Sequence, residues 1–332
     1  MSSFASLFSS AIVFGTILML GAMGEILTEK SGHLNLGVPG LMFLGGYAGF
    51  ASAFLYEKST ENPSIVLMII IPLITSFGVS ALGGLLYSFF TVTLRANQNV
   101  TGLALTYIGV GIGSFGGVFT LLKAGYSSYA KAGLTYDIFS ANINTYLNFG
   151  VFGQLFLSYG FMIYIAIGLA IFLQLFLKKT RVGLNLRAVG ENPATADAAG
   201  INVTKYKYFS TVIGAGICGL GGLIYIIIYK NGGWSTTNDI EALGWLSVAL
   251  VIFATWKPIN TIWGSYLFAF LFWIGSYAYQ LTGISLTTYQ KDLLKILPYL
   301  FTILILIIIS LRKKRENQPP ASLGLAYFRE DR

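Results

Sequence analysis

Residues that commonly carry catalysis are scarce in this chain. A single cysteine, Cys218, and a single histidine, His33, leave no material for a disulfide framework or for a zinc site built from cysteine and histidine. The run from Gly214 to Gly219, GAGICG, matches the G-x-G-x-x-G fingerprint of dinucleotide-binding proteins. That fingerprint needs a preceding strand, but this run is apolar, and its glycines favour close packing of helices. We therefore expect no cofactor, no metal and no catalytic residue.

The loop 178–207, KKTRVGLNLRAVGENPATADAAGINVTKYK, contains the pattern of one short helix. Asn192 can cap its first turn, Pro193 suits the first helical position, and Gly200 can end it in the left-handed conformation. A helix of about seven residues is too short to be stable alone in water, so it must dock on another surface. That surface is either the protein's own helix ends or a groove on a partner subunit.

The second alternative is a coupling helix, a rigid knob that transmits motion from a partner. Alanines permit close approach, and charged side chains can contact the rim of a groove. The residues that would make this contact are Arg187, Glu191, Asn192, Pro193, Ala196, Ala199 and Gly200. No G-x-x-x-x-G-K-[ST] pattern occurs in the sequence, so ATP, if it drives the function, must be bound by that partner.

Polar side chains also enter the apolar runs, where they are costly unless they face a polar interior. Asn99 has two interpretations, as a helix cap serving Thr101 or as part of a polar path for a substrate. Tyr107 and Trp245 can stack on a planar ring. The candidate path residues are Asn35, Asn99, Thr106, Tyr107 and Trp245.

Acidic residues at the end of the first run favour a structural function. Glu25 is expected to pair with Lys30 or with a backbone donor near the interface, and His33 is interpreted as an ordinary turn residue. Most tryptophans lie near the ends of runs, where aromatic belts of membrane proteins occur.

These residues must be positioned by membrane helices. Of the 332 residues, 55% are hydrophobic and only 10% are charged, with a mean hydropathy of +0.70, whereas soluble domains carry about 25% charged residues. The composition predicts an all-α, polytopic transmembrane bundle of about 8–10 spans. The run 243–256 is short, which allows for a broken or re-entrant helix. The hydrophobic runs are 5–27, 36–56, 64–94, 98–122, 153–177, 208–229, 243–256, 261–281 and 296–311.

Charge asymmetry orients the chain. Alternating the runs places most of the 21 lysines and arginines on one side, which the positive-inside rule makes cytoplasmic. The net charge of +8 is then explained by the excess of lysine and arginine on the cytoplasmic side, and nucleic-acid binding is not expected. We expect a transmembrane domain at 1–311, with the cytoplasmic loop 178–207 and an external segment at 123–152. Residues 312–332 are expected to form a mobile cytoplasmic tail.

Three motifs carry a resemblance to a known family. RAVGENPATADAAGI with the following GAGICGLGG resembles the cytoplasmic loop of ABC-importer permeases of the branched-chain amino acid/ribose superfamily. GEILTEKSGHLNLGVPGLMFLGG and GWLSVALVIFATWKP are similar to the nucleoside and simple-sugar branch, and the resemblance covers most of residues 15–312. Two departures are Pro39, where the branch often has an acidic residue, and Ala254-Thr255, where a glycine is usual before the tryptophan.

The resemblance implies a multi-pass permease subunit of the plasma membrane that imports nucleosides by alternating access and is not itself an enzyme. It implies a separate ATP-binding-cassette ATPase, an extracellular solute-binding protein, and a second permease subunit, a heterodimer being favoured over a homodimer. The alternatives are a permease for a simple sugar such as ribose, and an ion-coupled secondary transporter. The latter usually has ionisable residues at mid-membrane, which the runs lack.

Overall fold

The computed structural model describes residues 3–127, 129–142, 144, 150–235, 239–283, 285, 287–312 and 318–328, and these are almost entirely helical. Two short antiparallel strands, β1 (Tyr129–Lys131) and β2 (Gly233–Ser235), pair Tyr129 with Ser235. Two π-helical turns, η1 (Phe89–Thr93) and η2 (Tyr225–Tyr229), extend long helices. The helices are α1 (Ser3–Glu29), α2 (Val38–Ser59), α3 (Ile65–Ser88), α4 (Gln98–Lys123), α5 (Gly133–Ser140), α7 (Gly150–Phe156), α8 (Phe161–Lys179), α9 (Arg181–Glu191), α10 (Pro193–Ala198), α11 (Val203–Ile224), α12 (Ile240–Phe253), α13 (Pro258–Thr282), α14 (Thr288–Leu294) and α15 (Leu297–Arg312).

Seven helices of the described chain are long and apolar enough to cross a membrane. They are α1, α2, α3 with η1, α4, α8, α11 with η2, and α13. The two remaining hydrophobic runs of the sequence form α12 and α15. The prediction of a polytopic helical bundle is confirmed.

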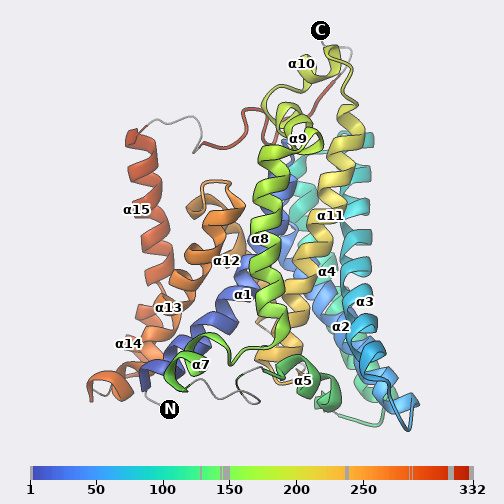
Figure 1. Ribbon diagram of the computed structural model, residues 1–332. Coiled ribbons are helices and arrows are strands. Elements are labelled where there is room, and N and C mark those ends of the chain that lie inside the picture. Colours follow the sequence, from blue (N-terminus) through green and yellow to red (C-terminus); the bar gives the residue numbers. More distant parts are fainter. Residues whose placement is uncertain are drawn as a thin grey trace.

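The two ends of the bundle carry different elements. Helices α9 and α10 lie at the same end as the C-terminus, whereas the N-terminus, α5, α7 and α14 lie at the opposite end (Figure 1). This arrangement separates the loop 178–207 from the segment 123–152, as the alternation of hydrophobic runs predicts.

Helix α12 does not cross the whole bundle. Its 14 residues extend about 21 Å, less than the roughly 30 Å of a hydrocarbon core. It ends in a turn at residues 254–257, from which α13 returns toward the end that carries the N-terminus (Figure 1). Thr255 and Trp256 in this turn both have a φ of 53°, in the left-handed region. The glycine that the resembling family usually has before this tryptophan would adopt that conformation without strain.

The centre of the bundle is packed through glycines. Helix α11 contacts α1, α2 and α3, and its glycines lie directly against neighbouring backbones. A Cβ added at Gly222 would lie 1.8 Å from the carbonyl oxygen of Met42, and one at Gly214 would lie 2.4 Å from that of Gly24. The G-x-G-x-x-G run is therefore a packing surface, as its apolar context predicts.

Trp234 departs from the expected aromatic belt. It is fully buried and packs against Phe43, Tyr47, Phe50 and Gly117. The small glycine on α4 leaves room for the indole, so the ring fills the bundle interior near β2 instead of anchoring a helix at the membrane interface.

Candidate coupling site and transport path

Helix α10 has the local structure that the sequence predicts. The side-chain oxygen of Asn192 accepts a hydrogen bond from the Thr195 N–H at 3.0 Å, and Pro193 occupies the first helical position. Gly200 has a φ of +82°, and its N–H donates to the carbonyl of Asp197 at 2.9 Å. The cap and the left-handed closing residue make α10 a rigid element despite its length.

A second helix, α9, precedes α10 and was not predicted. Thr180 caps it by accepting from the Gly183 N–H at 3.0 Å. Arg187 and Glu191 therefore lie on α9, where both are exposed, and do not form the rim of α10 itself. The signal that could have revealed α9 is the Thr180 cap followed by apolar residues at helical spacing.

Among the predicted coupling residues, Ala196 differs in its surroundings. It is buried in a small cluster with Val189 of α9 and Val203 of α11. Ala199 and Gly200 are exposed beyond it. Ala196 therefore fixes α10 onto its own chain, whereas Arg187 of α9 and Ala199, directly after α10, are exposed.

The tail does not behave as its polar composition suggests, and the expectation of a mobile segment is wrong for residues 318–328. The Ser322 hydroxyl donates to the carbonyl of Gly190 at 2.6 Å. The Tyr327 hydroxyl donates to Asp197 Oδ2 at 3.0 Å. Side-chain contacts with α9 and α10, which composition does not reveal, hold the tail against the loop 178–207.

Residues 30–37, which join α1 to α2 and which we call the hub turn, are fixed by side chains from four helices. The fixing residues belong to α1, α3, α4 and α11, so the turn connects most of the bundle. The bonds are Glu25 Oε1 with the Asn35 N–H at 2.9 Å, the Tyr87 hydroxyl with the Leu34 carbonyl at 2.7 Å, Gln98 Oε1 with the Leu34 N–H at 2.8 Å, the Thr106 hydroxyl with the Leu36 carbonyl at 2.8 Å, and His33 Nδ1 with Thr211 Oγ1 at 3.1 Å.

The two acids of α1 brace neighbouring turns. Glu25 accepts from a backbone N–H of the hub turn, which confirms its structural function and selects the backbone donor over Lys30. Glu29 accepts a hydrogen bond from the indole N–H of Trp256, in the turn after α12. Trp256 is buried, so it joins two helix ends and is not part of an interfacial belt.

Burial shifts the pKa values of two side chains in the hub turn, Lys30 and His33. Burial, followed by the charge of the nearby Arg187 guanidinium, lowers the pKa of Lys30 to about 8. Burial, followed by the positive charge of Lys207, lowers the pKa of His33 well below its usual value. The interpretation of His33 as an ordinary turn residue is therefore incomplete, because the ring is buried, neutral and bonded to Thr211.

The candidate path residues separate into two groups. Asn35 and Thr106 come together at the hub turn, and both are buried there. Asn35 Oδ1 accepts from the Gly37 N–H at 2.9 Å. Asn99 is exposed on the first turn of α4, but the cap of this helix is Asn97, which accepts from the Val100 N–H at 3.1 Å.

Tyr107 and Trp245 flank the start of α2. A Cβ on Gly40 would lie 2.6 Å from the Cα of Thr106, and one on Gly244 would lie 2.3 Å from the Cα of Pro39. Helices α4 and α12 therefore meet the first turn of α2 at adjacent residues, next to Tyr107 and Trp245. The Tyr107 side chain is 74% exposed, and Trp245 is partly exposed.

Four functional contacts escaped the sequence analysis: those of Tyr87, Gln98, Thr211 and Trp256. Each is a polar group inside or beside an apolar run, a position that costs free energy unless a partner is present. That feature is visible in the sequence, but the partners are far along the chain and were not identifiable. Among the described residues, no group of three or more metal-ligating side chains comes together.

The fold defines a polytopic membrane protein with a short, capped helix docked at one end. Residues 7–310 match the family described as the branched-chain amino acid transport system / permease component, so the chain belongs to that family. It is a transport component, in agreement with the resemblance that its motifs carry.

Relatives with more specific names cover almost the whole chain. The nucleoside ABC transporter permease protein NupC of Lactococcus lactis is 30% identical over 90% of both chains. The guanosine ABC transporter permease protein NupQ of Bacillus subtilis is 29% identical over 90% of this chain and 89% of its own. The putative glucose ABC transporter permease protein TsgC13 of Haloferax volcanii is 30% identical over 82% of this chain and 77% of its own. No solved structure matches the chain significantly.

Proposed function

We propose that this chain is one permease subunit of an ATP-binding-cassette importer that moves nucleosides across the plasma membrane. The observation that carries the proposal is the full-length similarity to the permeases of Lactococcus and Bacillus that are named for nucleosides and guanosine. The end with α9, α10 and the tail is then cytoplasmic, as the lysine and arginine distribution favours. Segment 123–152 faces outward, toward an extracellular solute-binding protein.

The coupling contact is assigned to the exposed face of α9 and α10. Arg187 and Glu191 supply charge, Asn192 and Pro193 supply a rigid start, and Ala199 and Gly200 permit close approach. Their rigidity matters because a frayed helix would absorb motion instead of transmitting it. A separate ATPase subunit docks here and supplies the energy.

The hub turn connects this contact to the path. A Cβ on Gly190 of α9 would lie 2.3 Å from the carbonyl oxygen of Lys30, so α9 touches the hub turn directly. The same turn begins α2, which α4 and α12 flank with Tyr107 and Trp245. Displacement of α9 by the ATPase therefore moves the start of α2 relative to these two aromatic side chains, and alternating access follows from that movement.

The path itself is assigned to the exposed side of α4, completed by a second permease subunit. Tyr107 and Trp245 are suited to stack on a base, and Asn99 offers hydrogen bonds at the entrance to the cytoplasm. Asn35 and Thr106 are buried at the hub turn and support the wall of this path. A heterodimer is favoured, and a relative named NupB in the Lactococcus strain that has NupC supports this pairing.

Transport of a simple sugar is the second candidate, because the Haloferax relative is named for glucose. Uptake by the reconstituted importer with its solute-binding protein separates the two. We expect labelled guanosine or uridine uptake that excess unlabelled nucleoside abolishes and excess ribose or glucose leaves unchanged. Uptake that only sugars inhibit would overturn the substrate and leave the permease assignment standing.

The coupling assignment has its own test. Glu191→Ala combined with Pro193→Ala should leave the complex assembled, lower nucleoside uptake at least tenfold, and abolish substrate stimulation of ATP hydrolysis. Lys179→Ala, an exposed change at the end of α8, is the matched control. If the double variant keeps full uptake and full ATPase stimulation, α10 is not the coupling helix.

A further inference from the structure

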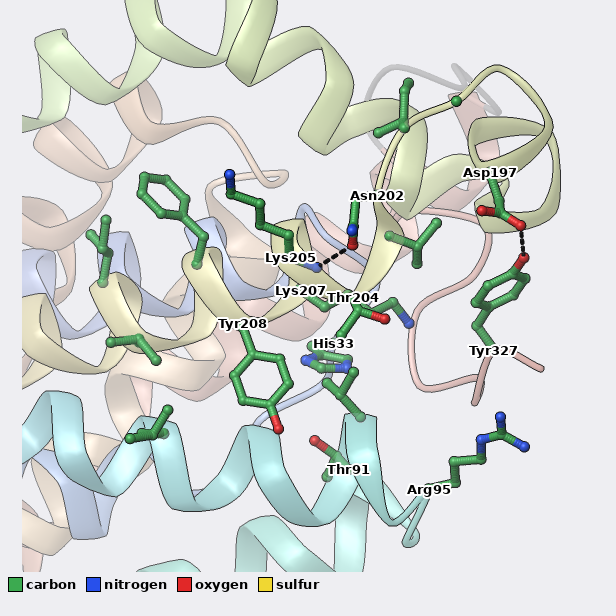
Figure 2. A pocket seen from close by; sticks show the side chains of 18 residues that line it. His33, Thr91, Arg95, Asp197, Asn202, Thr204, Lys205, Lys207, Tyr208 and Tyr327 are labelled. Carbon is green, nitrogen blue, oxygen red and sulfur yellow. Dashed lines mark hydrogen bonds between the residues drawn. The ribbon is translucent and has the colours of Figure 1, made fainter. Parts of the chain in front are cut away.

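A large pocket opens beside the loop 178–207, called the coupling loop below, between the last turns of α3 with η1 and the first turns of α11. Its volume is about 970 Å³. Figure 2 shows Lys205, Lys207 and Tyr208 on the α11 side, Thr91 and Arg95 on the opposite side, and Tyr327 with Asp197 at one end. This pocket is separate from the helix faces assigned to the substrate path, and it borders the face assigned to the ATPase, with which it shares Gly200.

The wall of the pocket holds a buried cation that lacks a partner in the described chain. Lys207 is only 3% exposed. Among the described residues, no carboxylate lies within 4.0 Å of its ammonium group, and no hydrogen bond of that group is present. A buried charge without a partner is strongly unfavourable, so the position of Lys207 favours occupation of the pocket by an anion.

Other cationic and polar side chains line the same pocket as Lys207. Lys205 and Arg95 add two positive charges, and the hydroxyl of Thr204 adds a neutral donor. The single acid lining the pocket, Asp197, accepts a hydrogen bond from the Tyr327 hydroxyl. Three cations and one carboxylate in the lining leave the pocket positive, and donors from both of its walls suit the oxygens of a phosphate group.

The other half of the pocket is apolar. Leu85 of α3 and Phe209, Val212 and Ile213 of α11 line it, and all four lie further into the bundle than the cations. Helix α11 with η2 has 27 residues and extends about 40 Å, beyond a hydrocarbon core of roughly 30 Å. Its first turns, with Lys205 and Lys207, therefore lie at headgroup depth, above an apolar groove that reaches the acyl chains.

We propose that this pocket binds the phosphate of an anionic phospholipid, with Lys207, Lys205 and Arg95 on the headgroup and the apolar groove on an acyl chain. The bound lipid sits between the end of α3 and the start of α11, directly below α10. It therefore neutralises Lys207 and ties the coupling loop to the inner leaflet.

Native mass spectrometry of the whole importer tests this assignment. The complex is equilibrated with phosphatidylglycerol or phosphatidylcholine of identical acyl chains. The wild type should retain phosphatidylglycerol at least fivefold better, and Lys207→Met should remove that preference. Arg95→Gln changes an exposed residue that does not support the core, and should weaken retention about fivefold, the effect of one basic side chain at an anionic surface.

Lys179→Met is the matched control, because it removes an exposed charge at the same end of the bundle but outside the pocket, and it should not change lipid retention. A competition experiment adds glycerol phosphate, a soluble molecule with the same phosphate group, at millimolar concentration. Displacement of the lipid by glycerol phosphate at equal concentration would overturn the lipid as the source of the phosphate. Equal retention of phosphatidylglycerol by wild type, Lys207→Met and Arg95→Gln would overturn the site itself.

Discussion

Two regions hold the bundle together by different physical means. The contact of α2 with α11 is made of glycines and backbone, so it depends on shape and van der Waals packing. The hub turn is held by hydrogen bonds with the side chains of Glu25, Tyr87, Gln98, Thr106 and Thr211. Shape-based contacts tolerate no added atom, whereas polar contacts respond to protonation and to loss of one donor. The region held by polar contacts lies against α9, where Gly190 meets the backbone of Lys30.

The largest effect is expected from Gly222→Ala in the shape-based region. The added Cβ would lie 1.8 Å from a backbone oxygen, so α2 and α11 must separate. We expect a loss of about 3 kcal/mol or more in the free energy of unfolding, measured by titration with SDS. Gly78→Ala, on an open face of α3, is the matched control and should be neutral or slightly stabilising.

Trp256→Phe tests a polar contact next to the hub turn, the hydrogen bond from the indole to Glu29. The change removes the indole donor from the buried Glu29, so about 2–3 kcal/mol of stability should be lost. Trp263, 55% exposed on α13, provides the comparison, and Trp263→Phe should change stability by less than about 0.5 kcal/mol. Equal midpoints for the two variants would contradict the assigned bond.

The pH dependence of stability should also distinguish the regions. In the folded protein the pKa of His33 lies well below 6.5, whereas the unfolded chain takes up the proton near pH 6.5. At His33 the unfolded state therefore binds more protons below that pH, so the contribution of this residue to stability falls as pH falls, by about 2 kcal/mol between pH 6.5 and 5. His33→Asn should reduce that slope, and an unchanged slope would show that other groups cause it.

The smallest effect is expected in the turn after α12. Thr255 has a φ of 53°, a conformation that is strained for a β-branched residue. Its hydroxyl accepts a hydrogen bond from Asn260 Nδ2 at 3.2 Å, which offsets part of the strain. Thr255→Gly should therefore raise stability by only about 0.5–1 kcal/mol, whereas Ala254→Gly, at a residue with an ordinary helical φ, should lower it.

The sequence by itself determined the membrane class, the positions of the spans and the capped helix α10. Each depends on neighbouring residues: hydropathy over about 20 positions, or the fixed spacing of Asn192, Pro193 and Gly200. The family motifs, equally local, identified the kind of permease.

Only the tertiary structure decided the rest. The bond between Glu29 and Trp256 joins residues 227 positions apart, and the contacts of Tyr327 and Gln98 likewise cross the chain. The mobile-tail prediction failed for the same reason, because composition records polarity and not the acceptor that a distant helix presents. The pocket around Lys207 arises because two helices and a loop enclose a lysine that has no anionic partner among the described residues.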